Sequence, residues 1–103
     1  MSLQQKIPDR IVDEYVAILQ TYGYEGFCNH IITCGLLRET SFLDIYYLDQ
    51  SEAIFHLFRE TQNENYLAVS KGLRRAAHKL HRQYLRINTD YPKNKRFLKL
   101  IRV

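Results

Sequence analysis

The sequence is short of the residues that cross-link a chain or break its regular structure. Its 103 residues include two cysteines, two prolines, four glycines and no tryptophan. Two cysteines are too few for a disulfide scaffold, so we expect both thiols to stay reduced in a cytoplasmic protein. No run of 18 apolar residues is present, so we expect no membrane-spanning helix. The first ten residues also lack the apolar run of a signal peptide.

Motifs that carry catalysis or bind cofactors are missing as well. The sequence has no G-x-S-x-G, no glycine-rich phosphate loop and no H-E-x-x-H. Cys28, His30 and Cys34 lack the C-x-x-C spacing of zinc ribbons. His78 and His81 share a helix side, but their surroundings are strongly cationic and would repel a metal. We therefore expect a non-enzymatic protein with no cofactor and no metal site.

The chain does contain enough apolar bulk for one folded domain. Hydrophobic residues make up 46% of it, including eight tyrosines and five phenylalanines, and 25% of the residues are charged. These are ordinary values for a globular protein. A chain of this length buries roughly two thirds of its unfolded surface without cross-links. Residues 1–103 are therefore expected to form a single domain.

Residues 66–87 have the pattern of an amphipathic helix. At about 100° per residue, the apolar side chains fall within one arc of the helix. This arc contains Tyr66, Val69, Leu73, Ala76, Ala77, Leu80, Tyr84 and Ile87. The opposite arc contains Lys71, Arg74, Arg75, His78, Lys79, Arg82 and Arg86, and we assign His81 to the same basic face. A solvated helix face usually mixes charge signs, so this face favours a polyanion-binding surface over mere solvation.

Charge is divided unevenly along the chain, whose net charge is +4. Residues 1–70 contain four basic residues against ten acidic ones, a balance of −6, whereas residues 71–103 contain eleven basic residues against Asp90 alone, a balance of +10. Two interpretations remain open. The halves either neutralise each other, within the fold or across a dimer, or the second half forms a basic surface for a polyanion.

Local signals divide the chain into helices. Pro8 suits a first helical position, and Gly23 suits a helix end. Asp49 and Glu52 form a capping pair that predicts a break within residues 42–58. The four residues 61–64 match a capping box in front of the basic helix. Gly72 inside that helix either permits close packing or marks a joint.

The expected fold is a compact all-α bundle of about five helices. They are placed near residues 8–22, 25–34, 41–48, 51–60 and 63–88, with a terminal turn near 95–102 in the basic tail 89–103. The expected core consists of Ile11, Tyr15, Leu19, Phe27, Ile31, Phe42, Ile45, Phe55, Phe58, Leu73, Leu80 and Tyr84.

The leading functional hypothesis is a small DNA-binding or RNA-binding protein, or a regulator that acts by binding nucleic acid. Its phosphate contacts would release counterions from the nucleic acid. The residues predicted to make them are Lys71, Arg74, Arg75, Lys79, Arg82 and Arg86, with Lys93, Lys95, Arg96 and Lys99 as a second patch.

A helical adaptor or inhibitor is the alternative hypothesis. It would use the same basic face on an acidic protein partner, or pair its acidic half with the basic half of a second copy. The aromatic residues of the 42–58 segment could supply a symmetric homodimer interface. A standard helix-turn-helix is disfavoured, because the apolar stripe of residues 66–87 is unbroken.

Overall fold

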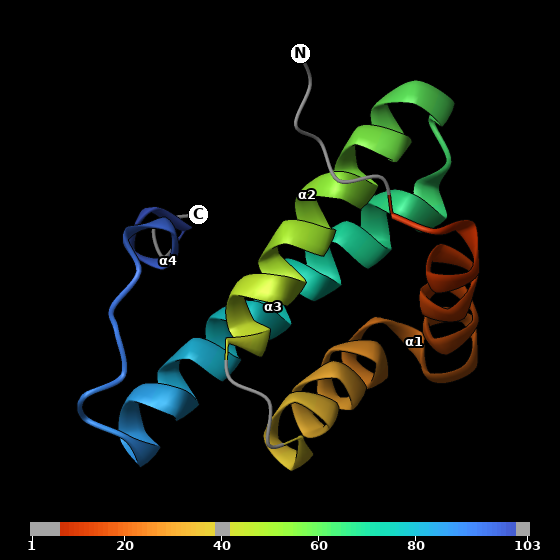
Figure 1. The fold of residues 1–103 in the computed structure, drawn as a ribbon. Coiled ribbons are helices and arrows are strands. Elements are labelled where there is room, and N and C mark those ends of the chain that lie inside the picture. The colour runs from red at the N-terminus through yellow and green to blue at the C-terminus, as the bar shows by residue number, and fades with distance from the viewer. Residues whose placement is uncertain (1–6, 39–41, 101–103) are drawn as a thin grey trace.

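The protein is an all-α molecule, as predicted from its sequence (Figure 1). The computed structural model describes residues 7–38 and 42–100, with side chains described as far as Phe97. Four helices are assigned within these ranges: α1 (Asp9–Leu37), α2 (Leu43–Thr61), α3 (Glu64–Ile87) and α4 (Lys95–Leu100). In the described residues, no helix is both long enough and apolar enough to cross a membrane.

Helix α3 is the centre of the structure. Figure 1 shows α2 lying antiparallel along one side of it, with the second part of α1 on another side. α1 and α2 have few direct contacts, among them a hydrogen bond from the Tyr15 hydroxyl of α1 to Gln50 of α2, so both helices pack mainly on α3. Asn63 caps the start of α3, because its side chain accepts a hydrogen bond from the backbone N–H of Asn65 at 3.0 Å. The helix predicted at 63–88 is thus confirmed nearly to the residue.

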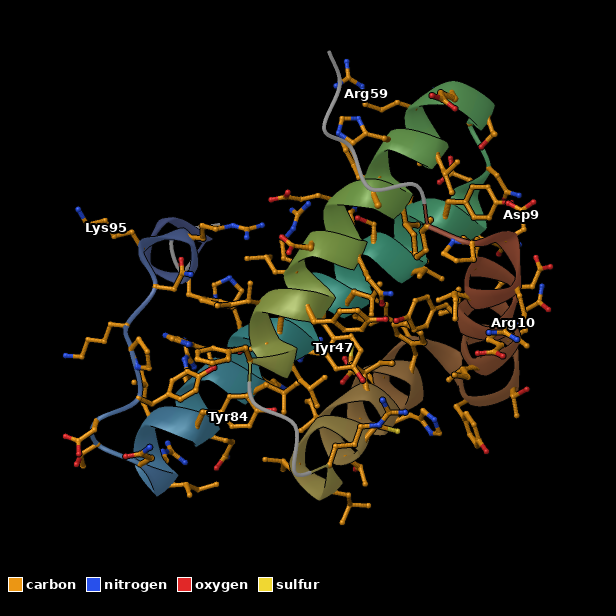
Figure 2. The ribbon with its side chains drawn as sticks, in the orientation of Figure 1. Asp9, Arg10, Tyr47, Arg59, Tyr84 and Lys95 are labelled. Atoms are coloured by element: carbon orange, nitrogen blue, oxygen red, sulfur yellow. The ribbon has the colours of Figure 1, made fainter. Side chains whose placement is uncertain are left out.

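Helix α1 is bent at Gly23. The backbone there has φ 75° and ψ 179°, outside the helical region, and the two parts of α1 run in different directions (Figure 1). Glycine takes such a positive φ without steric cost, so the predicted break at Gly23 is confirmed. The second part passes Gly35, where a helix end was expected. Gly35 is buried, and its carbonyl accepts a hydrogen bond from the Tyr84 hydroxyl of α3 at 2.9 Å (Figure 2).

Helix α2 is continuous, so the break predicted between residues 48 and 51 is wrong. Ser51 lies in the middle of α2 and is fully buried against Ser70 of α3. Its hydroxyl donates to the Ser70 carbonyl at 2.7 Å, and the Ser70 hydroxyl donates to the Ser51 carbonyl at 2.8 Å. These reciprocal bonds to a neighbouring helix satisfy a hydroxyl that would otherwise compete with the helical backbone.

The hydrophobic core collects around the apolar stripe of α3. Of the residues predicted for the core, five are buried and six are partly buried, but Phe42 is 48% exposed. Phe42 precedes α2 with φ 67°, which turns its ring outward against Tyr91. The buried core residues outside both the predicted core list and the α3 stripe are Val12, Leu43, Tyr47, Leu48, Ile54 and Phe97.

Gly72 permits close packing of α1 on α3. A Cβ atom at this position would lie 2.6 Å from Cδ1 of Phe27 and 2.8 Å from its Cε1. Cys28 adds a weak hydrogen bond from its thiol to the Gly72 carbonyl at 3.7 Å. The residue that weakens the helix in isolation is therefore the one that lets the two helices approach.

Gly72→Ala is expected to lower the free energy of unfolding by about 1–3 kcal/mol, because the added methyl group overpacks the core at Phe27. Helix propensity alone predicts a gain of about 1 kcal/mol, so the sign of the change separates the two effects. Urea denaturation gives the value. Gly72→Ala should cost less in a Phe27→Leu background, and equal costs in both backgrounds would contradict this assignment.

Candidate nucleic-acid interface

The outward face of α3 presents a row of positive charge. We call this row the cationic ridge. Its members are all exposed and follow one another at three- or four-residue steps, so they share one side of the helix. The ridge spans fifteen residue steps, about 22 Å at 1.5 Å per residue. It consists of Lys71, Arg75, Lys79, Arg82 and Arg86.

The other predicted phosphate-binding residues are placed elsewhere. Arg74 is half-buried on the flank of α3, whereas Lys93 and Lys95 are exposed beyond the end of that helix. Lys95 points away from α3 (Figure 2). The side chain of Lys99 lies outside the described part of the structure. The ten predicted residues thus do not form one surface.

Arg96 is turned towards α2. Its guanidinium donates to Asp49 Oδ1 and to Glu52 Oε1, both at 2.8 Å. These ion pairs join α4 to α2 and use carboxylates from the acidic half of the chain. At Arg96, acidic residues of the first half of the chain therefore neutralise a basic residue of the second half, as one interpretation of the sequence expected. Most of the cationic ridge has no such acidic partner among the described residues.

One carboxylate does reach the cationic ridge. Glu25 of α1 accepts a hydrogen bond from Arg75 at 2.8 Å, and both side chains are largely exposed. The Arg75 guanidinium also lies 5.9 Å from the centre of the Tyr24 ring, within the range of a cation–π contact. Hydrogen bonding to Glu25 and to Tyr24 raises the pKa of Arg75. Among the described residues, no carboxylate forms an ion pair with Lys79, Arg82 or Arg86.

A hollow of about 330 Å³ opens beside these three cations. It lies between α1 and α3, and its lining combines positive charge, two side-chain amides and one apolar side chain. The lining residues are Asn29, Ile32, Lys79, Arg82, Gln83 and Arg86. Sequence reasoning missed Asn29, Ile32 and Gln83, because no local pattern tells which part of α1 packs beside α3.

The assignment of His81 to the basic face is wrong. His81 is 6% exposed, and its Nδ1 lies 2.9 Å from Oδ2 of the fully buried Asp44. Its ring stacks on Phe97 with 4.3 Å between centroids and 8° between planes. His81 therefore faces inward, towards the junction of α2, α3 and α4.

His78 is also drawn towards this junction. It is half-buried, its ring meets Phe97 edge-on at 5.3 Å, and its Nε2 is buried without a hydrogen-bond partner among the described residues. Burial lowers the pKa of His78, and the charges of Arg82, His81 and Arg74 lower it further. The imidazole is therefore held in its neutral form more firmly than an exposed one.

Asp44 anchors the segment that follows α3. Besides His81, the Tyr91 hydroxyl donates to it at 2.6 Å, through Oδ1. Burial and this hydrogen bond raise the pKa of Tyr91. The buried carboxylate is thus hydrogen-bonded through both oxygens, as a buried carboxylate must be. Tyr91 bonds to α2, and Phe97 packs on His78 and His81 of α3, so the chain after α3 is held at the junction of these two helices.

The cysteine region offers no metal geometry. Cys28 is buried, and burial raises the pKa of its thiol, whereas His30 is exposed and stacks on Tyr22 at 5.8 Å. Within the described ranges, no three histidine, cysteine or acidic side chains gather closely enough to hold a metal ion.

Comparisons with known proteins give no relative: no family model, curated protein or solved structure matches the chain. Its function must therefore be argued from its own geometry.

Asp44→Ala should destabilise the protein by about 3 kcal/mol, because it leaves the buried His81 and the half-buried Tyr91 hydroxyl without their acceptor. Tyr91→Phe removes one hydrogen bond to the same carboxylate and should cost about 1.5–3 kcal/mol. Chemical denaturation of both variants tests whether Asp44→Ala lowers the free energy of unfolding more than Tyr91→Phe does. Two equal, near-zero changes would show that the buried cluster does not hold the segment.

His78→Leu is expected to flatten the pH dependence of stability. The pKa of His78 in the fold lies below its ordinary value of 6.5. As the pH falls through about 6.5, the unfolded chain therefore takes up a proton before the folded one, and stability decreases. Urea midpoints at pH 7.5 and 5.5 should differ less in the variant than in the wild type. If the urea midpoint changes equally with pH in the variant and in the wild type, His78 does not contribute to the pH dependence of stability.

Proposed function

We propose that the protein is a small nucleic-acid-binding protein that contacts phosphates with the cationic ridge of α3. The observation that carries this proposal is the row of five exposed cations on one helix side, of which Arg75 alone is ion-paired within the described residues. Phosphates repeat along a nucleic-acid strand, and a row about 22 Å long can neutralise several of them. Arginines supply planar, bidentate donors for phosphate oxygens.

The cationic ridge lowers the stability of α3 through repulsion between like charges, and this cost supports a binding role. Lys71 and Arg75, Arg75 and Lys79, and Arg82 and Arg86 are pairs of like charge at i,i+4. Each such pair destabilises a helix by about 0.2–0.5 kcal/mol. Acidic residues at some of these positions would have relieved the repulsion at no cost to the core. A polyanionic ligand provides the compensating charge.

Self-association through opposite charges is the second candidate. Asp9, Asp13 and Glu14 are exposed in the first turns of α1, and no described cation pairs with them. They could meet the cationic ridge of a second copy. A dimer that dissociates in high salt, together with no binding of nucleic acid, would favour this candidate.

Fluorescence anisotropy with labelled oligonucleotides across a salt series tests the proposed function. The logarithm of the affinity should fall with the logarithm of the salt concentration by about 0.7 per phosphate contacted on a single strand and about 0.9 on a duplex. The variant Lys79→Glu/Arg82→Glu should lose at least about tenfold in affinity and reduce this slope by about 1.4 or more.

Arg10→Glu/Arg59→Glu is the matched control, because it changes the net charge equally at exposed positions in α1 and α2 (Figure 2). It should weaken binding far less. Equal losses in the two variants would assign the binding to overall charge and not to the cationic ridge. If nothing binds at 50 mM salt, the nucleic-acid proposal is overturned.

A further inference from the structure

We propose, building on the function proposed above, that the ligand is a single-stranded nucleic acid and that one of its bases enters the hollow between α1 and α3. Phosphates on either side of that nucleotide would lie on Lys79, Arg82 and Arg86. The inference rests on how α3 is packed and on which side chains line the hollow.

Helix α3 is poorly placed to read a duplex. The major groove is about 12 Å wide and admits a helix that projects from its protein. α3 instead has α1 on one side and α2 on another, and Phe97 of α4 covers its histidines. Between residues 69 and 86 of α3, the exposed side chains are those of the cationic ridge, which forms a narrow arc of the helix. A helix flanked on several sides in this way presents one row of charge, which suits a flexible backbone better than the inside of a groove.

The hollow is an open recess whose lining has the chemistry to accept one base. Its volume of about 330 Å³ is at the lower end for ligand pockets, which span about 300–1,000 Å³. Asn29 and Gln83 bring side-chain amides, each with donors and an acceptor. Ile32 adds an apolar surface against which a base can lie. Amides of this kind read the edges of bases, and in a single strand those edges are free.

Tyr24 and Glu25 of α1 both contact Arg75, which lies one helical turn before Lys79 on the cationic ridge. Tyr24 is 36% exposed beside Arg75, so its ring is available to a second base. Aromatic rings next to cations are the usual elements of single-strand recognition. In the free protein, the Glu25 carboxylate is paired with the Arg75 guanidinium, where a phosphate of the ligand would bind. It is thus a built-in competitor, and its removal should tighten binding.

Anisotropy with labelled single-stranded homopolymers of each base and with a duplex of equal length tests the inference. We expect single strands to bind at least about tenfold more tightly than the duplex at equal salt. Glu25→Gln should raise the affinity for single strands severalfold. Asn29→Ala/Gln83→Ala should reduce the differences in affinity between the four homopolymers while leaving the salt slope unchanged, since neither amide contacts a phosphate.

Gln20→Ala/Thr33→Ala, at exposed polar positions of α1 outside the hollow, is the matched control and should preserve the base preference. Far-UV circular dichroism checks that each variant is folded. Tighter binding to the duplex, or an unchanged base preference in Asn29→Ala/Gln83→Ala, overturns the inference but leaves nucleic-acid binding intact. Absence of binding to every oligonucleotide at 50 mM salt overturns both.

Discussion

The structure depends on the burial of one stripe of α3 by two helices, α1 and α2, that have few direct contacts with each other. Val69, Leu73, Ala76 and Leu80 are fully buried in this stripe. Gly72 and the serine pair between α2 and α3 then set how closely the neighbours approach. Burial of this stripe sets the rotation of α3 about its own axis. The cationic ridge, on the opposite side of the helix, therefore faces solvent.

The acidic first half of the chain neutralises some basic residues of the second half and leaves others without an acidic partner. Arg96 is held by carboxylates of α2, and the Asp44 cluster holds Tyr91 and His81, so acidic residues of α2 fasten the basic tail to the body. On the cationic ridge, Glu25 alone of the described carboxylates makes an ion pair. The acidic half thus stabilises the fold at one place and leaves a concentrated positive field at another.

Local periodicity was enough to predict the helical class, the limits of α3 and the bend at Gly23, because each depends on residues a few positions apart. The predictions that failed depend on distant partners. The Asp49–Glu52 pair looks like the start of a new helix until Ser51 is found bonded to Ser70 of α3, and His81 looks cationic until Asp44 is found 37 positions away. The hollow between α1 and α3 is of the same kind, since it exists only when these two helices are docked.

The most direct test of the account is to map the binding surface by NMR, following backbone amide shifts of the protein as an unlabelled single-stranded oligonucleotide is added. The account predicts that the largest changes fall on residues 71–86 of α3 and residues 24–32 of α1, the two sides of one groove. Changes confined to α2 or to residues 88–97, with residues 71–86 unaffected, would contradict it.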